Sequence, residues 1–342
     1  MEGKPASTET QTPMRPDGAD EEMAHEAERF ASYISYWESA WSRTCGFFID
    51  QTALTSMQYT HHTPGRIPTN SAGSTPETLQ IFSIKLAELA GGFKWPLSVY
   101  GVVAARDIVD HNRNILFSCI RSQAQELKHD DPFLRLTGPT RAIVCSDTVE
   151  FEIQLKVKGT TQSQDEALIR CALCYKNSRC TLELCLQRVA QTVQATILGI
   201  QVVKGSWPFE HGARVACSSL SGEIVCTDAG LARIINPSSS QIVLLDSKDG
   251  AKLKGFDGHL HVWRQVVSVG TRGELGVEIQ AYSKSGDIAT RGHVSFMTKF
   301  CNISQEKCAL DGAEVLITVA WSLVPTERCS IVDDGSRRGN LV

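Results

Sequence analysis

Residues 149–158 read Val-Glu-Phe-Glu-Ile-Gln-Leu-Lys-Val-Lys, an unbroken alternation of apolar and polar side chains. This period of two predicts a β-strand with one buried face and one solvated face. Strands with a solvated face belong to antiparallel sheets, because parallel sheets are covered on both faces. Short apolar segments separated by turn residues recur from Leu79 to Val324. The pattern predicts a mainly β domain over residues 45–325, an antiparallel two-sheet β-sandwich, with jelly-roll and C2-like arrangements as alternatives.

A different period precedes the strands. Large apolar side chains recur at helical spacing in residues 21–44, which predicts one amphipathic helix that docks on the β domain. The members of this stripe are Phe30, Tyr33, Ile34, Trp37 and Trp41. Glu26, Glu28 and Arg29 are expected on the solvated face, and a helix exposed for a protein partner is the alternative. Residues 1–20 and 326–342 are expected to be disordered tails.

Composition excludes several function classes. The net charge is -4, with 34 basic and 38 acidic residues, so bulk charge provides no basis for binding nucleic acid or an anionic membrane. The first residues lack the apolar core of a signal peptide, and no run of about 18 apolar residues occurs. We therefore expect a cytoplasmic protein, with the nucleus as the alternative. Its 12 cysteines are expected to be reduced thiols.

The densest polar group in an apolar region predicts a corner between two strands. Its members are Arg106, Asp107, Asp110, Arg113 and Asn114. Such residues could bind an ion or an anionic ligand. The favoured interpretation is structural, because a tight connection near a core must provide hydrogen-bond partners for its freed backbone groups.

Two groups have the residue types of a metal site. Cys171 and Cys174, followed by Cys180 and Cys185, could bind zinc, but the spacing is unusual for paired zinc knuckles. His259 and His261 are expected on one face of a strand, as in metal-binding jelly rolls, but no carboxylate follows until Glu274. Buried thiols and surface histidines are the preferred interpretations, so no cofactor is expected.

Glu26-Ala27-Glu28-Arg29 resembles the Glu-x-x-Arg core of ribosome-inactivating N-glycosidases. That resemblance implies a carboxylate that supports an oxocarbenium-like sugar and an arginine at the leaving base. The spacing is common on helices, and only 25 residues precede Glu26. We interpret it as a coincidence on a solvated face.

Three longer segments resemble a large family of grass proteins known only as the domain of unknown function DUF6598. They are WPLSVYGVVAARDIVDHNRN (95–114), DPFLRLTGPTRAI (131–143) and VEFEIQLKVKG (149–159). The resemblance extends over about residues 24–324 and implies no catalytic residues. Some relatives are joined to a ribosome-inactivating domain, which implies an association with stress or defence.

These observations predict a non-enzymatic β protein that binds an unknown protein or small ligand. The alternative is an enzyme, either a metal-dependent jelly roll using His259 and His261 or a divergent N-glycosidase using Glu26 and Arg29. An open groove lined by Arg106, Asp107 and Arg113 would favour recognition of an anion or a carboxylate.

Overall fold

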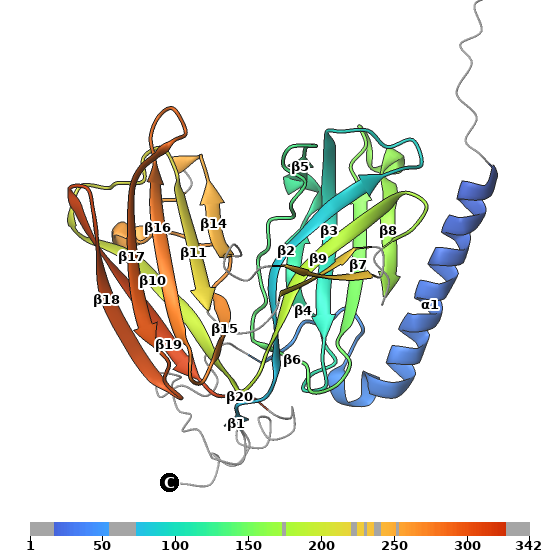
Figure 1. Ribbon diagram of the computed structural model, residues 1–342. Coiled ribbons are helices and arrows are strands. Elements are labelled where there is room, and N and C mark those ends of the chain that lie inside the picture. Colours follow the sequence, from blue (N-terminus) through green and yellow to red (C-terminus); the bar gives the residue numbers. More distant parts are fainter. Residues whose placement is uncertain are drawn as a thin grey trace, which may run out of the picture.

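The computed structural model describes residues 17–54, 73–172, 176–219, 224–228, 231–235, 241–250 and 253–325. Two β lobes lie side by side, and helix α1 (Asp17–Cys45) follows the outer side of the first lobe (Figure 1). All pairs of named strands are antiparallel, which confirms the predicted mainly β class. The described residues form five sheets, so the arrangement is more elaborate than one pair of sheets.

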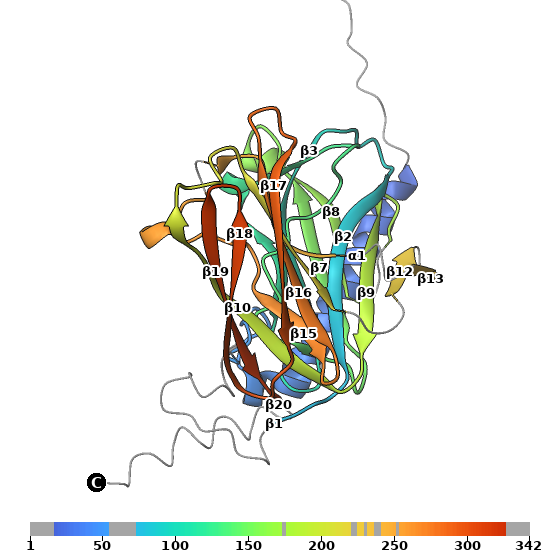
Figure 2. The same cartoon turned by 60° about the vertical axis from the view of Figure 1, so that its left-hand side comes forward.

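The first lobe contains two large sheets. One has the order β13-β12-β9-β2-β6, and the other has the order β4-β3-β7-β8 with β5 beside β3. The bounds are β2 (Thr78–Leu89), β3 (Leu97–Arg106), β4 (Asn114–Cys119), β5 (Gln125–Leu127), β6 (Ile143–Val144), β7 (Glu150–Val157), β8 (Glu166–Ala172), β9 (Cys180–Val189), β12 (Ile224–Asp228) and β13 (Leu231–Ile235). Short 3-10 helices η1 (Arg121–Gln123) and η2 (Gln162–Gln164) lie in the connections. β12 and β13 continue the sheet beyond β9 at the edge of this lobe (Figure 2).

The second lobe has the sheet orders β15-β10-β19-β18 and β14-β11-β16-β17. The bounds are β10 (Thr192–Gly205), β11 (Ala213–Ser219), β14 (Ile242–Ser247), β15 (Val266–Gly270), β16 (Glu274–Tyr282), β17 (Ile288–Met297), β18 (Asn302–Leu310) and β19 (Ala313–Ser322), with the 3-10 helix η5 (Phe256–Gly258). A two-stranded sheet of β1 (Gly73–Ser74) and β20 (Val324–Pro325) joins the chain ahead of the first lobe to the end of the second.

Each lobe has its own hydrophobic core. The core of the first lobe gathers side chains from both of its large sheets, including Ile81, Val103 and Leu155. The core of the second lobe does the same and includes Val269 and Ile317. The described residues of the range 45–325, expected as one domain, thus contain two large cores.

Helix α1 confirms the predicted amphipathic helix, but it begins at Asp17, inside the segment 1–20 expected to be a tail. Phe30 and Trp37 are buried, and both pack around Phe48 just after the helix. The Trp37 indole N–H donates to the His111 carbonyl at 3.0 Å. No helix in the described ranges has both the length and the apolar character needed to cross a membrane. Residues 326–342, the other expected tail, lie outside the described residues.

The prediction that Glu26 lies on the solvated face of α1 is wrong. Glu26 is 8% exposed, and its carboxylate accepts hydrogen bonds from the backbone N–H of Arg170 and, at 2.8 Å, from the Asn177 side chain. Glu26 stands four residues before Phe30 and so shares its face of the helix. Because β8 is an edge strand, this carboxylate satisfies a backbone donor that has no neighbouring strand.

Candidate functional site

The predicted polar corner is the connection from the end of β3 to the start of β4. Arg106 and Asn114 are the terminal residues of these two strands. All five predicted members are buried, and Arg113 is the most exposed of them at 9%. Burial of so many charged groups requires partners for each, because an unpaired charge in a protein interior costs several kcal/mol.

Glu152, the third residue of β7, is the partner of two of these arginines. One carboxylate oxygen lies 2.6 Å from Arg106 Nη2, and the other accepts from Arg113 Nη2. The alternating pattern of β7 predicted a solvated Glu152, but this residue is fully buried. The prediction failed because the turn after α1 covers this end of β7, and the period of a strand carries no information about such a cover.

A second ion pair closes the other side of the corner. Asp107 accepts from Arg141 Nη1 at 2.6 Å and from Nη2 at 2.7 Å, and it also accepts from the Val144 backbone N–H. Burial alone would lower the pKa of Arg141, but the charge of Asp107 and the hydrogen bonds to it raise the pKa above its ordinary value. The sequence interpretation missed Arg141, although it lies in the segment 131–143 already singled out.

The remaining members of the corner serve the backbone. Asn114 donates to the Arg141 carbonyl at 2.9 Å and accepts from the Thr140 backbone N–H. Asp110 accepts from the Thr52 hydroxyl at 2.6 Å and from the Asn112 backbone N–H. These contacts tie the corner to the segment after α1 and to the segment before β6.

Aromatic rings cover the arginines. The Arg106 guanidinium lies 4.2 Å from the centre of the Phe48 ring and 5.0 Å from that of Trp37, within the range of cation–π attraction. Arg106 also donates to the carbonyls of His111 and Phe48. The corner is therefore a closed ion-pair network that attaches α1 to the first lobe, and Arg106 and Asp107 do not line an open groove.

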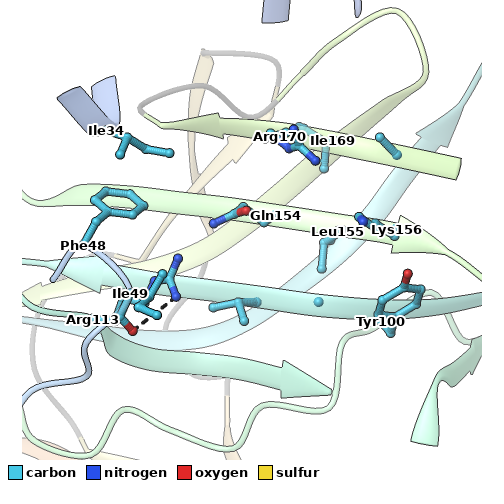
Figure 3. Close-up of a pocket in the computed structure, with 13 residues that line it drawn as sticks. Ile34, Phe48, Ile49, Tyr100, Arg113, Gln154, Leu155, Lys156, Ile169 and Arg170 are labelled. Carbon is cyan, nitrogen blue, oxygen red and sulfur yellow. Dashed lines mark hydrogen bonds between the residues drawn. The ribbon is translucent and has the colours of Figure 1, made fainter. Parts of the chain in front are cut away.

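A groove of about 320 Å³ begins where the corner ends. Its floor is formed by β3, β7 and β8, and Ile34, Phe48 and Ile49 form the wall on the α1 side (Figure 3). Arg113 is the only member of the predicted corner that lines this groove in the part of the chain that the structure describes. Its guanidinium is occupied by Glu152 and by the Ile49 carbonyl at 3.3 Å.

The floor of the groove is apolar in its middle, where Val102 and Ala167 lie, and the side chains of Leu155 and Ile169 are buried in the core beneath it. Its far end is fixed by Tyr100, whose hydroxyl donates to Asp165 at 2.8 Å. Asp165 also pairs with Arg121 Nε at 2.7 Å, and hydrogen bonds from Arg121 lower the pKa of this carboxyl well below its usual range. The floor of the groove thus has an apolar middle between two polar ends.

Two cations beside the apolar middle of the floor have no carboxylate partner among the described residues. Lys156 projects from β7 and Arg170 from β8, and both line the groove (Figure 3). No carboxylate in the described ranges forms an ion pair with either side chain. This differs from Arg113 and Arg121 at the two ends, which are both paired.

The histidine pair does not form the predicted site. His259 and His261 are both exposed, and β15 begins only at Val266, so the expected strand over 259–265 is wrong. His259 follows η5 and pairs with Gln201 in an isolated bridge outside the named strands. No cluster of three His, Cys, Asp or Glu side chains suited to a metal ion occurs in the described residues.

The cysteine group is buried where it is described. Cys171 and Cys180 lie in the core of the first lobe, whereas Cys174 lies outside the described residues. Burial raises the pKa of Cys180 to about 12, which disfavours the thiolate that a metal requires. The Glu26 and Arg29 pair is not assembled for catalysis either, because Glu26 is engaged by β8 and Arg29 is exposed.

Comparison with known proteins matches residues 78–319 to the family model of the domain of unknown function DUF6598. The chain belongs to this family. The matched range covers the corner, Glu152 and the floor of the groove, whereas α1 and Phe48 precede it. No similar protein was found among curated sequences, and no similar fold among solved structures.

Proposed function

We propose that this member of the DUF6598 family is a non-enzymatic binding protein whose groove beside α1 holds a small amphipathic anion. The observation that carries the proposal is the pair of unpartnered cations, Lys156 and Arg170, next to an apolar floor. Its volume of about 320 Å³ is at the lower end of the range of roughly 300–1,000 Å³ typical of ligand pockets. The apolar body of a ligand would lie on Val102 and Ala167, and its anionic group would accept from the two cations.

The remaining parts of the proposal rest on the sequence and on the family resemblance. They are a two-sheet sandwich, expected once over residues 45–325 and here proposed for each lobe, with jelly-roll and C2-like arrangements as alternatives, a cytoplasmic or nuclear location, and a role in stress or defence in grasses. The two large sheets that contribute to each core support the first of these.

The test is a fluorescence titration with 8-anilinonaphthalene-1-sulfonate, a sulfonate with an aromatic body, and with the neutral N-phenyl-1-naphthylamine. The double variant Lys156→Gln/Arg170→Gln should weaken binding of the sulfonate by at least about tenfold, since a hydrogen bond to a charged group contributes roughly 1.5–3 kcal/mol. Binding of the neutral dye should remain. Val102→Trp, which fills the groove, should weaken both.

Lys299→Gln is the matched control, because Lys299 is an exposed lysine of the second lobe that does not line the groove. It should bind both dyes as the wild type does. Equal affinity of the double variant and the wild type for the sulfonate would refute the proposed groove.

A further inference from the structure

A second cavity, of about 860 Å³, lies between the two lobes. The second lobe lies on the opposite side of the first lobe from α1 (Figure 1). The first lobe contributes Phe82 of β2 and Phe133 and Leu136 from the segment before β6. The second lobe contributes Val243 of β14 and the adjacent pair Trp263 and Arg264. The cavity is thus an inter-lobe site with apolar walls from both lobes, a common position for ligand sites.

Arg264 is the unusual residue of this cavity. It is 1% exposed, and the only hydrogen bond of its side chain among the described residues goes from Nη2 to the Ile81 carbonyl at 2.6 Å. Its Nε and Nη1 atoms are buried and have no partner. Burial lowers the pKa of Arg264 to about 10, so the guanidinium is still charged at pH 7. A buried charge of this kind is costly unless something compensates it.

Most of the other charged side chains around the cavity already have partners. Asp246 pairs with Arg214 at 3.4 Å and accepts from the Tyr282 hydroxyl, and Glu126 pairs with Lys128 at 3.2 Å. Arg135 lies over the Trp263 ring, 4.9 Å from its centre. Lys248 lies 5.6 Å from the Tyr282 ring, and the Asp131 carboxylate also lines the cavity. Arg264 remains the buried cation without a counter-ion.

We propose that the inter-lobe cavity binds a small carboxylate with an apolar body, and that Arg264 holds the carboxylate. The guanidinium turns about its terminal torsions to present one of its two N–H edges to the ligand, Nε with Nη2 or Nη1 with Nη2, while the apolar body packs against Trp263, Phe133 and Leu136. A carboxylate suits this site because it supplies the missing charge and accepts from a guanidinium in the plane of its N–H groups. A ligand held in this way contacts both lobes and fixes their relative position.

The experiment is isothermal titration calorimetry of the full chain with 3-phenylpropionate, and with 3-phenylpropionamide as the neutral analogue of the same shape. The acid should bind and the amide should not, because only the acid supplies a negative charge. Arg264→Met should weaken binding of the acid by about thirtyfold or more, as expected when one partner of a buried charge pair is removed. Val243→Trp, which fills the cavity and leaves the guanidinium intact, should abolish it.

Two controls separate this site from the groove beside α1. Lys156→Gln/Arg170→Gln and Lys299→Gln should bind 3-phenylpropionate as the wild type does. The inference is overturned if the acid does not bind, if acid and amide bind equally, or if Arg264→Met leaves the affinity unchanged. Should Arg264→Met fail to fold, retained binding by Val243→Trp would overturn it instead.

Discussion

Arg141 at the β3–β4 corner and Arg264 between the lobes are both almost fully buried, yet only Arg141 faces a carboxylate. At the corner, Asp107 offers both of its oxygens to Arg141, and Glu152 does the same for Arg106 and Arg113. Between the lobes, one backbone carbonyl is the only hydrogen-bond partner of the Arg264 guanidinium in the described ranges.

This difference separates two uses of a buried cation. The corner is complete in itself, since its charges compensate one another and Phe48 and Trp37 cover them. The corner attaches α1 to the first lobe, and a ligand would have to displace an existing ion pair to bind there. Arg264 carries a charge that the described chain leaves uncompensated, so an added anion gains an interaction without displacing another.

The largest expected effect is at Glu152. Glu152→Gln removes the charge that compensates two buried guanidinium groups, and we expect it to lower the free energy of unfolding by about 3–5 kcal/mol. That is a large share of the roughly 5–15 kcal/mol that stabilises a typical domain. Urea or guanidinium unfolding of the variant and the wild type measures the difference.

Glu183→Gln is the control for this prediction. Glu183 pairs with Lys85 at 2.9 Å, but both side chains are partly exposed, so its loss should cost less than about 1 kcal/mol. Equal unfolding midpoints for Glu152→Gln and the wild type would show that the corner does not depend on its central carboxylate.

Two matched substitutions sharpen the comparison with the inter-lobe cavity. Arg141→Met leaves Asp107 buried without its cation and should cost about 3 kcal/mol or more. Arg264→Met removes an uncompensated charge, and the Ile81 carbonyl keeps its hydrogen bond from Gln80 Nε2 at 2.9 Å, so the ligand-free protein should change by less than about 1 kcal/mol or become more stable. Denaturant unfolding of both variants gives the two values. A loss of stability in Arg264→Met as large as in Arg141→Met would mean that Arg264 mainly stabilises the contact between the lobes.

The secondary structure was predictable wherever the spacing of apolar residues along the chain determines it. The alternation over 149–158 predicted β7, and the stripe from Phe30 to Trp41 predicted α1. The arrangement into two lobes with separate cores was not predictable, because it depends on which sheets face each other across the chain. The same local evidence placed His259 and His261 on a strand, whereas these residues lie in the connection before β15.

The site was predictable only in part. Arg106 to Asn114 stood out as a polar group, but Glu152 and Arg141 lie 38 and 27 residues beyond Asn114, and their roles arise from tertiary contacts. Glu26 is different, since its place on the buried face of α1 was visible in the sequence. Its charge led to the wrong assignment to the solvated face. Arg264 gave no signal, because a lone arginine before a strand is ordinary until its burial is known.

The smallest expected effect concerns pH and the attachment of α1 to the corner. The His111 ring stacks on Trp41 with 3.5 Å between ring centres. Burial lowers the pKa of His111 below its ordinary value of 6.5, and the lowering prevails over the opposite influence of nearby carboxylates. The charged groups that act on this ring are Glu150, Asp107 and Asp110, which raise the pKa, and Arg106, which lowers it.

The unfolded chain takes up the His111 proton at a higher pH than the folded chain does. The contribution of neutral His111 to the free energy of unfolding is therefore complete above pH 6.5 and is lost as the pH falls through the folded pKa. Unfolding midpoints in denaturant should therefore decrease between pH 7.5 and pH 5.5. His111→Gln should decrease less than the wild type over the same interval, whereas His25→Gln, at an exposed position of α1, should behave as the wild type does. An identical pH dependence in His111→Gln and the wild type would show that His111 does not cause the decrease, and the stacked pair of Trp41 and His111 would then be a packing contact alone.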